Sequence, residues 1–150
     1  MNLKVLRIGV LLFVTLSLIA LSPPVFASVT SASLEGSSNV AYGKGSVTLW
    51  ARCYLRSIEL KGYKAMVKFT LYEDDGWKKD YITSWWEGPY AVGTVLQGYY
   101  PWTSFTVRPA SYNDIWDNTV EFKVKIEEIR TSDGKVMSTT WTNVFVVTLR

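Results

Sequence analysis

Apolar and polar residues alternate along three long segments of the chain, and this pattern limits its possible folds more than any other feature. In the segments 47–55, 65–71 and 120–126, every second residue is apolar. Successive side chains of a β-strand point to opposite faces, so each segment is expected to bury one face and expose the other. The pattern is typical of antiparallel sheets that pack on one side only.

Turn-forming residues separate these segments. Asp74-Asp75-Gly76 and Ser132–Lys135 predict hairpin turns, because Gly and Asp tolerate positive φ, and Gly43-Lys44-Gly45 and Lys61-Gly62 close two further segments. Strands are expected at 30–36, 46–57, 63–73, 79–86, 92–97, 102–108, 119–129 and 136–149. About seven or eight short strands in one domain predict a single antiparallel β-sandwich, whose pattern resembles the immunoglobulin or fibronectin type III architecture.

The last hairpin, Thr119 to Leu149, is the clearest local prediction. Its second arm has apolar residues on both parities: Trp141, Phe145, Val147 and Leu149 on one, and Val144 and Val146 on the other. Burial on both faces, a bulge or an interface would each explain this, and the sequence does not choose among them.

Residues 1–27 have the form of a secretory signal peptide. Lys4 and Arg7 precede an apolar run at 8–21, Pro23-Pro24 follows, and Ser28 is the expected mature start. The alternative is an uncleaved anchor, but a spanning helix needs roughly 20 apolar residues and this run is shorter. We therefore expect one domain, 28–150, that is secreted by a prokaryote and has no membrane span after cleavage.

Composition excludes several classes of function. The chain has 16 Lys+Arg and 13 Asp+Glu, and without the two basic residues of the leader the balance is 14 to 13, so no nucleic-acid partner is expected. Histidine is absent, which excludes His-based triads and His metal ligands. Cys53 is the only cysteine, so no intrachain disulfide can form, and its apolar parity predicts a buried, inert thiol.

Aromatic residues are the main functional signal. All seven Trp and all nine Tyr follow the leader, and the adjacent pair Trp85-Trp86 must face opposite sides of a strand. Aromatic rings also fit pleated surfaces for purely structural reasons, but so many suggest an exposed contact surface. The candidate ligand-binding residues are Trp50, Arg52, Tyr54, Trp77, Trp86, Tyr90, Tyr100 and Trp102.

Acidic residues give a weaker signal. Asp114 and Asp117 could contribute oxygen ligands to calcium, but their spacing does not match a calcium loop, and ordinary turn chemistry is the better explanation. We expect the solvent-exposed face of a strand to carry Glu121, Glu127 and Glu128, which form ion pairs with neighbouring lysines. We expect neither a cofactor nor a catalytic group, so the protein is not expected to be an enzyme.

The leading hypothesis is a secreted, non-catalytic sandwich that recognises a protein or cell-envelope ligand, and its sharper version is carbohydrate binding through exposed aromatic rings. Self-assembly is an alternative, in which the apolar strand Trp141–Leu149 pairs with the edge of a second copy and the protein oligomerises. A small polysaccharide or cell-wall hydrolase is the third alternative.

Overall fold

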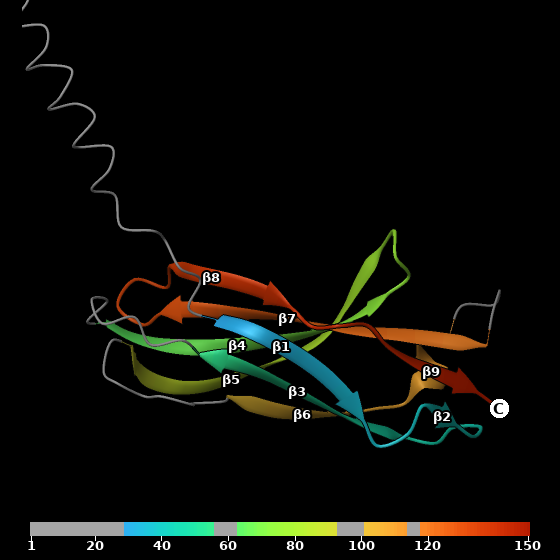
Figure 1. Ribbon diagram of the computed structural model, residues 1–150. Helices are drawn as coiled ribbons and strands as arrows, with labels where there is room; N and C mark the ends of the chain where they lie inside the picture. Colours follow the sequence, from blue (N-terminus) through green and yellow to red (C-terminus); the bar gives the residue numbers. More distant parts are fainter. Residues whose placement is uncertain (1–28, 56–62, 93–100, 114–117) are drawn as a thin grey trace, which may run out of the picture.

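Two packed β-sheets make up the part of the chain that the computed structural model describes, namely residues 29–55, 63–92, 101–113 and 118–150 (Figure 1). The smaller sheet has three antiparallel strands in the order β1-β3-β6. Their bounds are Val29–Gly36 for β1, Val47–Leu55 for β3 and Trp102–Val107 for β6.

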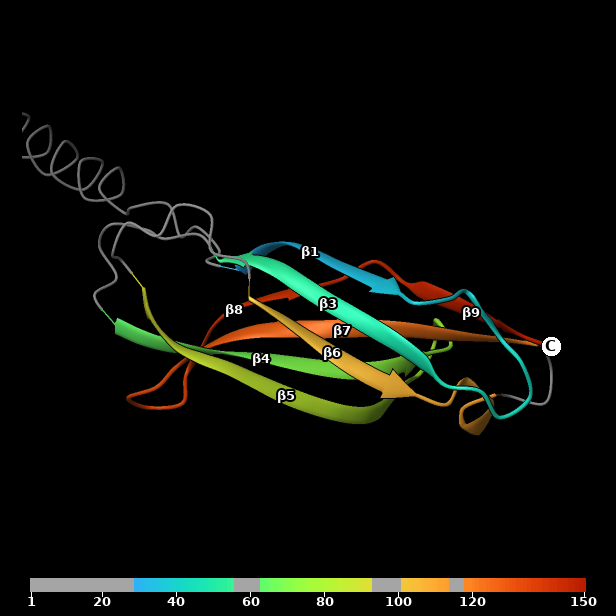
Figure 2. The same cartoon turned by 90° about the horizontal axis from the view of Figure 1, so that it is seen from below.

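The larger sheet has six strands, in the order β2-β9-β7-β4-β5, with β8 paired to β7 beside β9. Their bounds are Val40–Ala41 for β2, Tyr63–Asp74 for β4, Lys79–Val92 for β5, Thr119–Arg130 for β7, Val136–Trp141 for β8 and Phe145–Leu149 for β9. A single turn of 3-10 helix, Pro109–Ser111, follows β6. Figure 2 shows the smaller sheet in front, with β5 running beside β6.

The all-β prediction with two packed sheets is confirmed, but the prediction that every strand pair is antiparallel is wrong. β2 pairs with β9 in parallel, through Val40 with Thr148 and Ala41 with Leu149. A strand of two residues is too short to produce an alternating pattern, which is why the sequence did not indicate it. The expected strand 92–97 begins at the last residue of β5 and otherwise lies outside the described residues.

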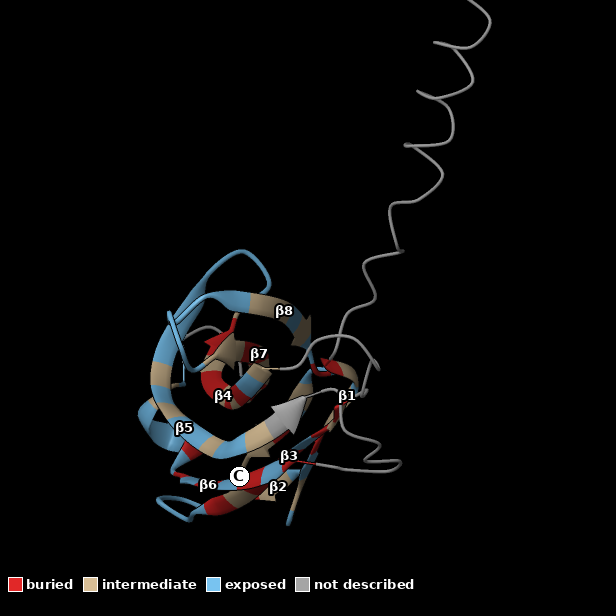
Figure 3. Cartoon of the chain, turned by 90° about the vertical axis from the view of Figure 1, so that its left-hand side faces the viewer, coloured by how far each residue is buried: buried red, intermediate tan, exposed pale blue. Residues whose placement is uncertain are grey.

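The alternating segments form the core between the sheets. Leu49 and Ala51 of β3 face Phe69 of β4 and Phe122 and Val124 of β7 across the interior, and all five side chains are fully buried. Figure 3 shows buried residues interspersed with more exposed ones along strands such as β3 and β4, whereas β5 is mostly exposed. The parity of the sequence therefore predicts which side chains are inside.

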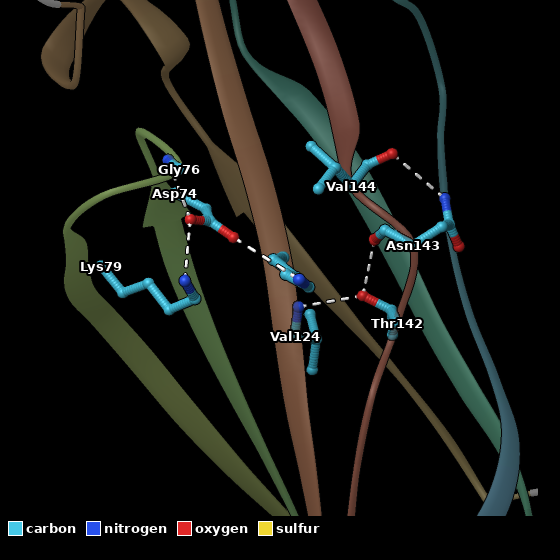
Figure 4. Close-up of polar contacts among 8 residues, drawn as sticks. Asp74, Gly76, Lys79, Val124, Thr142, Asn143 and Val144 are labelled. Carbon is cyan, nitrogen blue, oxygen red and sulfur yellow. Dashed lines mark hydrogen bonds and ion pairs between the residues drawn. The ribbon is translucent and has the colours of Figure 1, made fainter.

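A break in the last arm explains its mixed parity. In β8, Trp141 lies opposite Lys125 on the outer face, whereas Phe145 and Val147 of β9 lie on the inner face. Trp141, Phe145 and Val147 all have odd numbers, but Trp141 lies on the outer face and the other two lie on the inner face. The segment Thr142–Val144 therefore reverses the face on which odd-numbered residues lie. Thr142 holds the break against β7 by donating its amide to the Val124 carbonyl and accepting the Val124 amide with its hydroxyl, both at 3.0 Å (Figure 4).

The same break joins the two sheets along one side of the molecule. The Asn143 side chain accepts the Leu34 amide at 2.9 Å and donates to the Leu34 carbonyl at 3.1 Å, so it pairs with β1 as the backbone of a strand would. Nearer the start of β1, the Val29 amide donates to the Ser138 hydroxyl of β8 at 3.2 Å. We call this side, where β1 meets β8 and β9, the hydrogen-bonded side.

Glu128 also belongs to the hydrogen-bonded side, and its expected place on a wet face is wrong. Its exposed fraction is 0%, because it continues the inward parity of Val124 and Ile126. The Tyr63 hydroxyl donates to one carboxylate oxygen, and the Ser138 hydroxyl donates to the other at 2.9 Å. A buried carboxylate is tolerated here because hydroxyl groups from β4 and β8 hydrogen-bond to it.

A second buried carboxylate, Asp74, holds the turn between β4 and β5, which projects from the body of the sandwich in Figure 1. Figure 4 shows its contacts with Lys79 at 3.1 Å and with the Gly76 amide at 3.1 Å, and Lys123 of β7 lies at 3.7 Å. Burial alone would raise the pKa of the Asp74 carboxyl. The hydrogen bonds from Lys79 and Gly76 and the two lysine charges outweigh burial, so the pKa lies below its ordinary value.

Candidate binding surface

The outer face of the three-stranded sheet carries a hollow of about 580 Å³, which we call the first hollow. One face of β3 is buried and carries Leu49, Ala51 and Cys53. Because successive side chains of a strand point to opposite faces, Trp50 and Arg52 lie on the other face. The strand register then places Arg52 opposite Trp102 of β6. The residues that line the first hollow are Ser31, Ser33, Glu35, Trp50, Ala51, Arg52, Cys53 and Trp102.

Polar groups of the first hollow are held in place by one another. Arg52 forms an ion pair with Glu35 of β1, and its Nε donates to the Ser33 hydroxyl at 3.1 Å. The ion pair holds the two side chains next to each other. Because both are more than half exposed, the pair contributes little to stability. The guanidinium and carboxylate thus stand beside the Trp50 ring as hydrogen-bonding groups with a defined geometry.

A second hollow, of about 410 Å³, lies where β5 runs beside β6. Trp85 lies opposite Phe69 in the register of β4 and β5, so it faces the same side of the sheet as the core. Because β5 is at the end of its sheet, this ring extends past the core instead of into it and remains 56% exposed. The residues that line the second hollow are Trp85, Glu87, Tyr90, Trp102, Thr103 and Ser104.

Trp102 lines both hollows. Its ring is 61% exposed, and the Trp50 ring in the first hollow is 41% exposed. Trp85 completes the second hollow, where its indole N–H donates to Glu87 Oε1 at 2.8 Å. We call the region formed by Trp50, Trp102, Trp85 and the two hollows the tryptophan surface.

The structure brings together only some of the expected contact residues. Trp50, Arg52 and Trp102 meet in the first hollow, and Tyr90 lies in the second. Tyr54 is on the same face of β3 as Trp50 and Arg52 but is half-buried and does not line the hollow.

Other expected residues lie elsewhere. Trp86 is opposite Lys68 on the outer face of the larger sheet, where the lysine Nζ lies 5.2 Å from the ring centroid. Trp77 is 87% exposed in the turn between β4 and β5. Tyr100 and the weak calcium candidates Asp114 and Asp117 lie outside the described residues.

Sequence reasoning missed Trp85, Glu87 and Glu35. The sequence showed that Trp85 and Trp86 must face opposite ways, and the register confirms it. It gave no means of knowing that β5 ends its sheet, and this position is what exposes the inward-facing ring. Glu35 is placed by the pairing of β1 with β3, opposite Trp50, which links residues distant in sequence.

Metal-binding groups, the Cys53 thiol and a serine–lysine spacing are the other features that bear on chemistry. Within the described ranges, no group of three or more His, Cys, Asp or Glu side chains could hold a metal ion, and no helix is long and apolar enough to cross a membrane. Cys53 is buried as expected, and burial raises the pKa of its thiol to about 12. Ser132 and Lys135 have the Ser-x-x-Lys spacing of a serine–lysine pair, but both are exposed in the turn between β7 and β8.

Comparison with known proteins adds little to this geometry. No protein-family model and no curated protein matches the sequence. Among solved structures, the chain is similar to the sporulation control protein Spo0M from Bacillus subtilis, with 12% sequence identity and a TM-score of 0.47. The similarity covers 83% of this chain and 50% of that one, so the chain spans about half the length of Spo0M. A likeness this distant supports no inference about function.

Proposed function

We propose that the protein is a non-catalytic recognition protein that binds a carbohydrate chain on the tryptophan surface. The observation that carries the proposal is the set of three exposed tryptophans, Trp50, Trp102 and Trp85, that line two hollows sharing Trp102. Flat aromatic faces stack against the CH groups of sugar rings. The polar groups beside them, Arg52 and Glu87, can exchange hydrogen bonds with sugar hydroxyls.

The sizes and composition of the hollows support this proposal. Both volumes, about 580 and 410 Å³, lie in the range of small-ligand sites, roughly 300–1,000 Å³. A protein partner could also use exposed tryptophans as anchors. The carbohydrate proposal is favoured because ion-paired and hydrogen-bonded polar side chains lie directly beside the rings, which is the arrangement that a hydroxyl-rich ligand requires.

We further propose that the architecture is of the immunoglobulin or fibronectin type III kind. In that architecture the first, second, fourth and fifth main strands share one sheet, and the third, sixth and seventh share the other, to which some members add strands beside the third. Setting the short β2 aside, β1-β3-β6 matches the first, second and fifth strands, and β9-β7-β4 matches the seventh, sixth and third. β5 then takes the place of an added strand beside the third, and no described strand takes the place of the fourth. Export through cleavage of residues 1–27 completes the proposal and would place the tryptophan surface outside the cytoplasm.

The test is tryptophan fluorescence of the purified protein during titration with soluble polysaccharides and cell-wall fragments. A saturable change is expected, because sugar stacking alters the surroundings of the indole rings. Trp102→Ala should weaken binding at least tenfold, since this residue borders both hollows. Trp77→Ala is the matched control, because it removes an exposed tryptophan from the distant turn between β4 and β5.

The control also separates the possible results. Unchanged affinity in Trp102→Ala would mean that the ligand does not use the tryptophan surface, and an equal loss in both variants would mean that the effect is not specific to it. No binding by the parent protein to any member of the panel would reject carbohydrate recognition and favour a protein partner.

Self-assembly through Trp141–Leu149 has less support from the geometry. β2 already pairs with the end of β9, and Asn143 and Ser138 hydrogen-bond to β1 along the same edge. If copies do join by their edges, β5 and β6 are better placed, because each ends its sheet. Sedimentation of the purified protein at high concentration tests this alternative, and a monomer throughout would count against it.

A further inference from the structure

The two hollows of the tryptophan surface differ in charge. In the first, the charges of Arg52 and Glu35 balance each other in an ion pair. In the second, Glu87 is the only charged side chain among the described lining residues. One oxygen of Glu87 accepts the indole N–H of Trp85, and a carboxylate has further lone pairs with which to accept a donor from a ligand.

We infer that the ligand is a glycan chain that crosses Trp102 and places an amine-bearing sugar against Glu87. This inference rests on the proposed carbohydrate binding and adds the class of sugar. A sugar ammonium would form a charge-assisted hydrogen bond with the Glu87 carboxylate, which is stronger than a bond from a neutral hydroxyl. A sugar carboxylate would be repelled there, because no described side chain lining this hollow carries a positive charge.

The position of Trp102 also implies that the ligand is longer than one sugar. Trp50 lines only the first hollow and Trp85 only the second, whereas Trp102 lines both. A ligand that contacts all three rings must therefore extend across β6. Since linked units bind with a high effective concentration at the second position, affinity should rise with chain length until both hollows are filled.

The experiment compares oligosaccharides of one to four sugars, matched in length between classes, by tryptophan fluorescence at mildly acidic pH, where sugar amines are protonated. The probes are glucosamine oligomers, their N-acetylated counterparts and galacturonic acid oligomers. We expect the amine-bearing oligomers to bind about three- to fivefold more tightly than the N-acetylated ones, the size of one exposed ion pair, and the acidic oligomers to bind most weakly. The preference for the amine should shrink at high salt.

Glu87→Gln tests the residue directly. The amide keeps an oxygen that can accept the Trp85 N–H but loses the charge. The variant should bind N-acetylated and amine-bearing oligomers about equally. Asp80→Asn is the matched control, because it removes one negative charge from an exposed residue outside both hollows and should leave the preference unchanged.

The outcomes separate this inference from the proposal on which it depends. Absence of binding by all three oligomer classes would overturn this inference, and absence of binding by the polysaccharide and cell-wall panel as well would reject carbohydrate recognition itself. Two results would overturn only the assignment of the sugar amine to Glu87. One is that N-acetylated oligomers bind as tightly as amine-bearing ones, and the other is that Glu87→Gln keeps the preference for the amine. Preferred binding of the acidic oligomers would also overturn it. Affinity that does not change from one sugar to four would contradict a ligand that crosses Trp102.

Discussion

The two long sides of the sandwich are built differently. On the hydrogen-bonded side, side chains of β7, β8 and the segment after β8 connect to β1 and β4 through Glu128, Ser138 and Asn143. On the other side, β5 and β6 run next to each other as the end strands of their sheets, and no pairing joins them among the described residues. The space beside them is the second hollow, bordered by Trp85 and Trp102.

This difference separates stability from recognition. The hydrogen bonds of the hydrogen-bonded side reach buried groups, namely the Glu128 carboxylate and the backbone of Leu34, although the Asn143 side chain itself is exposed. Removing a partner there leaves a buried group without its hydrogen bond. Polar groups of the tryptophan surface, such as Arg52 and Glu35, are exposed and can exchange their partners for a ligand at little cost.

Replacement of Glu128 should have the largest effect on stability. Glu128→Ala leaves a cavity and removes the acceptor of the Tyr63 and Ser138 hydroxyls, so we expect a loss of about 3 kcal/mol in the free energy of unfolding. Urea denaturation followed by circular dichroism measures it. Glu121→Ala, on the outer face of the same strand, is the control and should cost less than about 1 kcal/mol. Equal losses would show that burial of Glu128 is not what matters.

Asn143→Ala should have the next largest effect. It removes both hydrogen bonds that the exposed Asn143 side chain makes to the backbone of Leu34, a residue that is 2% exposed. We expect a loss of about 2 kcal/mol and faster amide exchange at Leu34, measured by hydrogen–deuterium exchange. Asn39→Ala, an exposed residue before β2, is the control. Unchanged exchange at Leu34 would contradict the role given to Asn143.

Lys79→Met should have a smaller, pH-dependent effect at the turn between β4 and β5. Because the folded pKa of Asp74 is lowered, the carboxylate contributes stability that is present above its unfolded pKa of about 4 and lost as the pH falls through the folded value. The variant should therefore lose about 1 kcal/mol near neutral pH, and the difference from the parent should shrink below about pH 4. Thermal melts between pH 2 and 7 measure this.

Lys78→Met is the control for this experiment. Lys78 pairs with Asp80, and both side chains are more than half exposed. The substitution should leave the melts unchanged at every pH. A pH-independent difference for Lys79→Met would mean that the lysine acts by packing against Trp141, whose ring centroid lies 5.9 Å from its Nζ, and not through Asp74.

The alternating pattern of the sequence predicts most of the inward-facing residues on the hydrogen-bonded side, but not Glu128. Val120, Phe122, Val124 and Ile126 were predicted to face inward, and one further step of the same pattern reaches Glu128. Its charge predicts a solvent-exposed position instead, because carboxylates are almost never fully buried unless they have hydrogen-bond or ion-pair partners. Those partners, Tyr63 and Ser138, come from other strands, and only the pairing of β7 with β4 and β8 reveals them.

The tryptophan surface could be predicted only in part, for a similar reason. The outward parity of Trp50 and Arg52 is visible within one segment, and so is the opposition of Trp85 and Trp86. Which of those two rings joins Trp102 depends on the order of strands in two sheets, which no local pattern encodes. The sequence favours Trp86 as the contact residue, but Trp85 is the ring that lies in the second hollow.

The smallest effect on stability is expected from the ion pair of the tryptophan surface. Arg52 and Glu35 join β1 to β3, as Asn143 joins β1 to the segment after β8, but their charged ends are 57% and 60% exposed. A double-mutant cycle with Arg52→Gln and Glu35→Gln should give a coupling energy of about 0.5 kcal/mol or less, measured by urea denaturation, and still less at high salt. A coupling as large as the loss in Asn143→Ala would mean that the tryptophan surface also fixes the strands, and the separation of stability from recognition would then fail. With a small coupling, any effect of Arg52→Gln on sugar affinity can be assigned to the ligand contact itself.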